Sequence, residues 1–86
     1  PPAQGPPCVL VVEDEDALRA VLARELRKRG FDVYSTSSGD EAVEMYCRSS
    51  FRIDVVLMDV HMPGMSGPDA LDAIRAADPL VRCCFM

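Results

Sequence analysis

The feature that most restricts the fold is a short apolar run, Val55–Met58, that Asp59 follows directly. Four apolar residues are too few for an isolated helix, but their β-branched and large side chains suit a strand buried on both faces of a parallel sheet. An unpaired carboxylate inside such a strand would be costly. Turn-forming residues follow, in Met62-Pro63-Gly64 and Ser66-Gly67-Pro68. We therefore expect Asp59 at the carboxyl end of the strand, where open α/β sheets bind ligands.

A second apolar run, Cys8–Val12, also lacks alternation and predicts another buried strand. It is followed by four acidic residues. Acidic side chains are favourable in the first turn of a helix, where they face the positive end of the helix dipole, and this explains Glu15 and Asp16. Glu13 and Asp14 come earlier, directly at the end of the predicted strand. They therefore directly follow a predicted strand, as Asp59 follows Val55–Met58.

The other segments carry three helix patterns. An amphipathic helix continues to Arg29, and Gly30 supplies its left-handed cap. Ser38 and Glu41 have the spacing of a capping box, which begins a second helix. Pro68 marks the first turn of a third helix. The apolar residues expected to face the core are Leu18, Val21, Leu22 and Leu26 in the first helix, Ala42, Val43 and Met45 or Tyr46 in the second, and Leu71 and Ile74 in the third.

Four strands are predicted, over residues 8–12, 31–34, 54–58 and 81–86, with one helix between each pair. This alternation predicts an α/β fold with a parallel sheet and right-handed crossovers. If the first and third strands are neighbours, Glu13 and Asp14 approach Asp59 at one edge of the sheet. That arrangement requires the strand order 2-1-3-4, whose topological switch point lies between those two strands.

Three carboxylates that lie close together repel one another, so a shared proton or a cation must relieve the repulsion. Oxygen ligands at a solvent-open edge favour Mg²⁺ or Mn²⁺ over zinc. A carboxylate beside Mg²⁺ can act as the nucleophile toward a phosphoryl group, and Asp59 suits this role because it alone emerges from the middle strand. We expect Asp14 to hold the metal, with the backbone carbonyl of His61 as a third ligand and Glu13 assisting through a water.

Two segments, Val9–Asp14 and Leu57–Gly67, make the chain resemble the receiver domain of two-component response regulators. The resemblance extends from residue 9 to residue 86. It implies a three-layer, flavodoxin-like fold in which Asp59 accepts a phosphoryl group from the phosphohistidine of a histidine kinase or phosphotransfer protein. It also implies Mg²⁺ on Asp14, Asp59 and the His61 carbonyl. A receiver is a signalling domain rather than an enzyme, and at most catalyses its own phosphotransfer and dephosphorylation.

The chain departs from the family pattern at its carboxyl end. Receivers carry a Ser or Thr after the fourth strand and a Lys after the fifth, whereas this chain has one lysine, Lys28, and one threonine, Thr36, at other positions. The last helix, strand and helix of the fold are also expected to be missing. The predicted fourth strand would then be an exposed edge, through which a homodimer could form.

The composition argues against some classes of binding partner. The net charge of −5 argues against direct binding of nucleic acid or an anionic membrane, and no apolar run approaches the length of a membrane span. Residues 1–7 are rich in proline and read as a disordered lead-in to a domain over residues 8–86. The four cysteines show no metal-ligand spacing, and three of them lie in apolar surroundings. We expect reduced, mostly buried thiols and a cytoplasmic protein.

Three classes of function remain open. The first is a phosphoacceptor domain of a two-component phosphorelay. The second is an interaction module that does not respond to phosphorylation, or a fragment that associates through its edge, because the usual Lys and Ser or Thr are absent. The third is an aspartyl-phosphate phosphatase. Such phosphatases place a second Asp two residues after the nucleophile, where this chain has His61.

Overall fold

The computed structural model describes residues 5–49 and 52–86, so residues 1–4 of the expected lead-in lie outside the described part. Helices and strands alternate along the chain, as the sequence predicts. The elements are β1 (Cys8–Val12), α1 (Asp16–Lys28), β2 (Asp32–Thr36), α2 (Gly39–Arg48), β3 (Val55–Met58), α3 (Gly67–Ala77) and β4 (Cys83–Phe85). No helix in the described part is long and apolar enough to cross a membrane.

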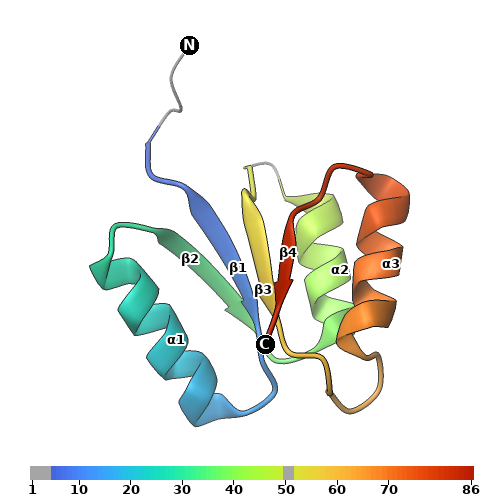
Figure 1. Ribbon diagram of the computed structural model, residues 1–86, viewed down its shortest axis with the longest axis horizontal. Coiled ribbons are helices and arrows are strands. Elements are labelled where there is room, and N and C mark those ends of the chain that lie inside the picture. The colour runs from blue at the N-terminus through green and yellow to red at the C-terminus, as the bar shows by residue number, and fades with distance from the viewer. Residues whose placement is uncertain (1–4, 50–51) are drawn as a thin grey trace.

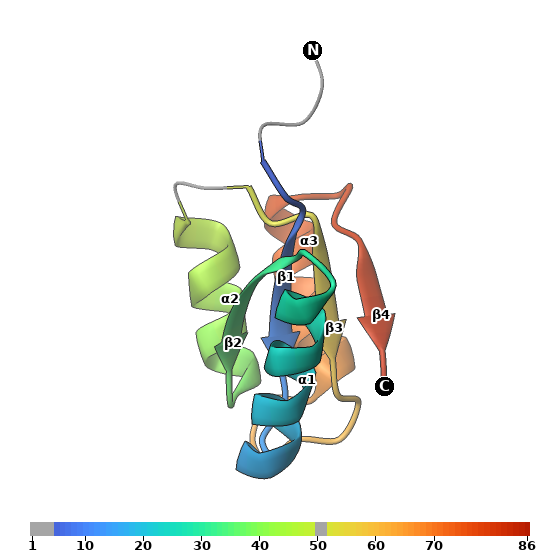
Figure 2. The same cartoon turned by 90° about the vertical axis from the view of Figure 1, so that its left-hand side faces the viewer.

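The four strands form one parallel sheet in the order β2-β1-β3-β4, which confirms the predicted order. Figure 1 shows the three layers, with α1 on one side of the sheet and α2 and α3 on the other. Figure 2, turned by a quarter, brings α1 in front of the sheet. The fold is therefore the expected flavodoxin-like α/β arrangement, in the part that the four strands and three helices cover.

Alternate residues of the central strands serve two separate cores. On the side of α2 and α3, Leu10, Val12, Val56 and Met58 pack with Ala42, Ala70 and Leu71. On the side of α1, Val9, Val11 and Val33 pack with Ala23. All five residues of β1 are buried. Side chains therefore cover β1 on both faces, as expected for a strand in the interior of a parallel sheet.

The face of the sheet on the side of α1 is only partly covered. Val55 and Leu57 of β3 are only half-buried, and Leu18 and Val21 of α1 are 40% and 45% exposed. The prediction that these two helix residues face the core is wrong. The reason is that α1 packs against β1 and β2 and is the one described helix on this face. No second helix therefore covers Leu18 and Val21 of α1 or the half-buried residues of β3.

The fourth strand is also shorter than expected. It covers three residues rather than the predicted six, and Cys84 and Phe85 are exposed on it. All four cysteines are free, as predicted, but only Cys8 is buried. The expectation of mostly buried thiols is therefore wrong. For Cys83 and Cys84 the cause is the position of β4 at the edge of the sheet, where only one side of the strand has a neighbour, whereas Cys47 lies on the exposed surface of α2.

The helix boundaries follow the predicted signals. The Ser38 hydroxyl accepts a hydrogen bond from the Glu41 N–H at 3.2 Å, and the Ser66 hydroxyl accepts one from the Asp69 N–H at 3.3 Å. Gly30 has a φ of 93°, which is the left-handed conformation expected after the last turn of α1. The two serine caps fix where α2 and α3 start, and Gly30 marks where α1 has ended.

Candidate functional site

The register of β1 against β3 creates the site. Val9 pairs with Val55 and Val12 with Met58, so the residue after each strand lies at the same level of the sheet. The Asp59 N–H donates to the Val12 carbonyl at 3.0 Å and extends the pairing by one residue. As a result, carboxylate oxygens of Glu13, Asp14 and Asp59 all lie within 4.8 Å of one another.

Asp54 secures the same register at the opposite end of the two strands. Its carboxylate accepts a hydrogen bond from the Cys8 N–H at 2.7 Å, and its own N–H donates to the Cys8 carbonyl at 2.9 Å. The bond to Cys8 holds the pKa of Asp54 below its ordinary value, and the Arg52 guanidinium, 2.7 Å away, acts in the same direction. A slip of one strand would break both contacts, so the alignment of the three acids is fixed from both ends.

Glu13 is the buried member of the cluster, with an exposure of 3%. Its carboxylate accepts a hydrogen bond from the Glu15 N–H at 3.0 Å. Burial raises the pKa of Glu13, and the neighbouring acids Asp14 and Asp59 raise it further, against the opposing effect of the Glu15 bond. The sequence predicts an assisting role for Glu13 but gives no sign of its burial.

The other two acids are open to solvent. Asp14 is exposed and Asp59 is half-buried. The His61 N–H donates to Asp59 Oδ1 over a long 3.3 Å, and the His61 residue itself is exposed. Asp59 therefore has one oxygen turned toward the backbone of its own loop, and the exposed imidazole makes no contact among the described hydrogen bonds.

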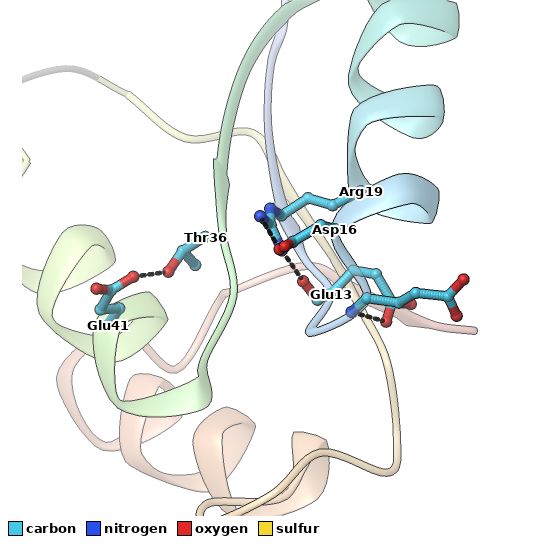
Figure 3. A network of polar contacts seen from close by, with 6 residues as sticks. Glu13, Asp16, Arg19, Thr36 and Glu41 are labelled. Carbon is cyan, nitrogen blue, oxygen red and sulfur yellow. Dashed lines mark hydrogen bonds and ion pairs between the residues drawn. The ribbon is translucent and has the colours of Figure 1, made fainter.

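Arg19 also lies beside the cluster, although it belongs to none of the sequence motifs that predict the site. Its guanidinium donates to the backbone carbonyl of Glu13 at 2.9 Å and to the carboxylate of Asp16 at 2.6 Å (Figure 3). The i,i+3 spacing of Asp16 and Arg19 on the first turn of α1 is a signal that could have indicated the ion pair. The bond to the Glu13 carbonyl depends on the path of the turn between β1 and α1, which no sequence pattern encodes.

The single lysine lies away from the cluster, and the single threonine adjoins it only through its backbone carbonyl, which accepts the Glu13 N–H at 3.1 Å. Lys28 ends α1 and pairs with Glu25 at 3.5 Å. Because α1 starts beside the acids and has 13 residues, Lys28 lies roughly 18 Å along the helix from them. Thr36, which is buried at the end of β2, donates its hydroxyl to the Glu41 carboxylate (Figure 3). Glu41 thus completes only half of the expected capping box, since its side chain binds Thr36.

Gly67, the first residue of α3, packs directly on the backbone of Asp59. Its N–H donates to the Val60 carbonyl at 3.0 Å. A Cβ at this position would overlap the Asp59 carbonyl oxygen and would lie 3.1 Å from Phe85 Cε1. The absence of a side chain at Gly67 therefore permits the loop from β3 to α3 to close over Asp59.

The donor set fits a hard divalent cation. Three carboxylates meet at the carboxyl edge of the sheet, and burial of Glu13 together with the neighbouring acids raises the Glu13 pKa; a bound cation would relieve this repulsion. Oxygen ligands without His nitrogen or Cys sulfur favour Mg²⁺ or Mn²⁺ over zinc. The cluster thus suits magnesium chemistry at a site open to solvent.

Comparison with known proteins identifies a family. The family model described as "Response regulator receiver domain" matches residues 9–86. The sensor kinase CckA of Brucella abortus is 40% identical over 82 residues, which are 95% of this chain and 9% of CckA. The sensory transduction protein RegX3 of Mycolicibacterium smegmatis is 44% identical over 68 residues, 79% of this chain and 29% of RegX3. The chain therefore spans less than a third of these relatives.

Solved structures of receiver domains and response regulators have the same fold as this chain. The receiver domain of the hybrid histidine kinase CckA has a TM-score of 0.84 and 40% identity, over 91% of this chain and 72% of that one. The response regulator TrrA of Thermotoga maritima has a TM-score of 0.82 and 31% identity, over 90% of this chain and 65% of that one. The four-stranded sheet and three helices described above are thus shared with receiver domains.

The packing of Gly67 predicts that Gly67→Ala displaces Asp59. We expect Mg²⁺ affinity to fall about tenfold, the scale seen when a supporting contact of a metal site is lost, because the added methyl group collides with the Asp59 backbone. We also expect the free energy of unfolding to fall by about 1–3 kcal/mol, as for other overpacked sites. Calorimetric titration with MgCl₂ and urea unfolding measure the two effects.

The matched control is Gly30→Ala. Gly30 has open space around it but a φ of 93°, so an alanine there costs stability, about 1–2 kcal/mol, without touching the site. Equal Mg²⁺ affinity in the two variants would contradict the assignment of Gly67 to the positioning of Asp59.

The raised pKa of Glu13 predicts a pH-dependent loss of stability in the metal-free protein. The folded chain binds this proton more tightly than the unfolded chain, so the free energy of unfolding falls as the pH rises from about 4, the ordinary Glu value, through the raised value. Glu13→Gln should therefore raise the free energy of unfolding at pH 7 by about 1 kcal/mol. Urea unfolding in EDTA at pH 7 and pH 4 measures this.

The gain should shrink at pH 4, which is below the ordinary Glu pKa of 4.5, because the wild-type carboxyl is then largely protonated in the unfolded state as well as in the folded one. Glu44→Gln, which alters an exposed carboxylate paired with Arg48 on α2, is the control and should change stability by less than about 0.5 kcal/mol. A Glu13→Gln protein that is less stable than wild type at pH 7 would show that the buried carboxylate is not a cost to the fold.

Proposed function

Because the chain belongs to the response regulator receiver domain family, we propose that it accepts a phosphoryl group on Asp59 from the phosphohistidine of a histidine kinase or phosphotransfer protein. The observation that carries this proposal is the meeting of three carboxylates from two neighbouring strand ends within 4.8 Å. The chain is thus a part of two-component signal transduction, and its proposed activity is phosphoacceptance in signalling rather than turnover of a substrate.

Each acid has a distinct role in this proposal. Asp14 and Asp59 hold Mg²⁺ together with the backbone carbonyl of His61, and Glu13 assists through a water. Asp59 is the nucleophile because it is half-buried at the end of β3, with one oxygen near the His61 N–H. Asp14 is the most exposed acid of the cluster, so an ion from solution can reach its carboxylate directly.

The transfer itself needs little from the protein beyond position and charge. An oxygen of Asp59 attacks the phosphorus of the phosphohistidine, and the P–N bond breaks with its electron pair returning to the imidazole nitrogen. The product is an aspartyl phosphate. Bound Mg²⁺ offsets the negative charge on the phosphoryl oxygens. The chain's own contribution is to hold the Asp59 carboxylate at the open edge of the sheet by the β3 to α3 loop and Gly67.

The relatives support the metal and the partner. The TrrA structure is a complex with Mg²⁺ and BeF, and TrrA has also been solved in complex with the histidine kinase ThkA. A histidine kinase is therefore the partner that we propose for this chain. We also propose a cytoplasmic location, with which the four free cysteines are compatible.

The exposed outer side of β4 favours a second candidate function, self-association. The Val56 N–H donates to the Arg82 carbonyl and the Met86 N–H to the Met58 carbonyl, both at 2.9 Å. Since alternate residues of a parallel strand turn to opposite sides, Cys83 and Phe85 present their N–H and C=O groups to the outer edge. Phe85 is 42% exposed beside it, and no strand of the described part pairs there. Such an edge is a template for pairing with a second copy of the chain.

The phosphoacceptor proposal predicts Mg²⁺-dependent labelling of Asp59. Acetyl phosphate with MgCl₂ should add one phosphoryl group, seen by intact-protein mass spectrometry, and EDTA should prevent it. Asp59→Asn should abolish the labelling. Asp14→Asn should slow it by at least about tenfold, because even supporting contacts of a metal are worth that much.

The control for this series is Asp72→Asn, an exposed carboxylate in the middle of α3 that pairs with Arg75 at 3.7 Å. It should label like the wild type. Labelling of the Asp59→Asn protein at the wild-type rate, or failure of the folded wild type to be labelled, would reject Asp59 as the phosphoacceptor.

The edge of β4 predicts a dimer that does not depend on phosphorylation. Sedimentation velocity should show concentration-dependent dimerisation in both wild type and Asp59→Asn. Phe85→Lys should abolish the dimer, because a charge on an edge strand opposes pairing. Val21→Gln removes a similarly exposed apolar side chain from α1 and should leave the dimer intact. A monomeric wild type at millimolar concentration, or a dimer that survives Phe85→Lys and is lost in Val21→Gln, would exclude pairing at β4.

A further inference from the structure

The turn from β1 to α1 is fastened at three points around Glu13. The Glu13 N–H donates to the Thr36 carbonyl at 3.1 Å, and the Glu13 carboxylate accepts from the Glu15 N–H at 3.0 Å. The third contact is the bond at 2.9 Å from the Arg19 guanidinium to the Glu13 carbonyl. In the first two contacts the donor is a backbone N–H group. In the third the donor is a side chain, and among the described hydrogen bonds Arg19 is the only side chain of α1 that reaches the turn.

The Glu13 carbonyl is the group that orients Asp14. The peptide unit between two residues is planar, so the direction of the Glu13 carbonyl also fixes the direction of the Asp14 N–H and the position of the Asp14 Cα. The Asp14 side chain itself is exposed and accepts none of the described backbone hydrogen bonds. The peptide plane before it, to which Arg19 bonds, therefore sets the direction in which Asp14 leaves the strand, and the Asp14 side chain also contacts the Glu13 carboxyl.

The charge of Arg19 is already matched within the helix. Its other nitrogen pairs with Asp16 at 2.6 Å, and the Arg19 side chain is 22% exposed whereas Asp16 is 89% exposed. In Figure 3 dashed lines run from the Arg19 guanidinium to the Asp16 carboxylate and to the Glu13 carbonyl. The Glu13 carboxylate accepts its hydrogen bond from a different donor, the Glu15 N–H. The guanidinium can thus hold the turn by its hydrogen bond to the Glu13 carbonyl. The negative charge of Asp16 meanwhile offsets the repulsion between Arg19 and a cation bound at the acids.

From this geometry we propose that Arg19 is a positioning residue of the acidic site, which orients Asp14 for cation binding by clamping the Glu13 to Asp14 peptide. This inference deepens the proposed function and rests on it for the identity of the ion. Arg19 does not touch the metal or the phosphoryl group. It acts through the backbone, and the planar guanidinium suits the role because it reaches two acceptors at once.

The proposal and a purely electrostatic role make opposite predictions. If Arg19 mattered only as a positive charge near the acids, its removal would tighten Mg²⁺ binding, because a repulsive charge would be gone. If Arg19 positions the turn, removal weakens Mg²⁺ binding. The sign of the change in affinity therefore separates the two roles.

The test is Mg²⁺ affinity by calorimetric titration in wild type, Arg19→Ala and Arg19→Lys, together with amide hydrogen exchange in the metal-free proteins. We expect Arg19→Ala to bind Mg²⁺ about tenfold more weakly. The Glu15 N–H, which is bonded to the Glu13 carboxylate, should exchange faster in the same variant. Arg19→Lys keeps the charge but offers one point donor, so its affinity should lie between the other two.

Arg48→Ala is the matched control, because Arg48 pairs with Glu44 at 2.9 Å on α2, away from the turn. It loses an ion pair of similar length and should keep Mg²⁺ affinity and Glu15 exchange unchanged. Tighter or equal Mg²⁺ binding by Arg19→Ala would overturn the proposal, and so would exchange at Glu15 equal to wild type. If Arg19→Ala does not fold, Arg19→Lys at wild-type affinity and exchange is the overturning result.

Failure of the two proposals can be told apart. A wild type that binds no Mg²⁺ would reject the proposed function. The exchange of the Glu15 N–H in metal-free Arg19→Ala and wild type would still decide whether Arg19 clamps the turn. Conversely, a wild type that binds Mg²⁺ and an Arg19→Ala variant that binds it equally would reject the clamp and leave the phosphoacceptor proposal intact.

Discussion

The parallel pairing of β1 with β3 is the constraint on which the rest of the structure depends. It sets Val12 opposite Met58, and the Asp59 N–H continues the pairing to the Val12 carbonyl. Because both strands run in the same direction, the acids that follow them leave the sheet side by side. A slip of one residue would turn the buried side chains of β3 to the opposite face, so the hydrophobic cores on the two sides of the sheet also enforce the meeting of the carboxylates.

This meeting has an energetic cost that the surrounding contacts reduce. Burial and the neighbouring acids raise the pKa of Glu13, which means that the ionised form is disfavoured where the fold places it. The Glu15 N–H and the Arg19 bond to the Glu13 carbonyl stabilise the turn without neutralising the carboxylates. Negative charge is therefore left at the site for a cation to neutralise. A divalent ion that binds there raises the stability of the folded protein, which the repulsion among the acids lowers in the absence of the ion.

The sequence predicts much of this arrangement because its strongest signals are local. Uninterrupted apolar runs that end in acids predict both central strands, the spacing of Ser38 and Glu41 predicts the start of α2, and Pro68 predicts the start of α3. What it does not predict depends on tertiary contacts. Leu18 and Val21 match a buried helical stripe, yet α1 lies over β1 and β2 and leaves them exposed. The burial of Glu13 and the reach of Arg19 to its carbonyl depend on the path of a single turn. Gly67 reads as a turn former, and only the loop above Asp59 shows why no side chain fits there.

If acids from two separate strand ends form one cation site, a paramagnetic ion bound there affects both strand ends at once. The paramagnetic effect of Mn²⁺ on the backbone amide resonances of the chain measures this. We expect substoichiometric Mn²⁺ to broaden residues 13–15 and residues 59–61 together, and excess Mg²⁺ to restore both sets. Broadening of only one of these segments, or broadening spread over the exposed acids of all three helices, would contradict it.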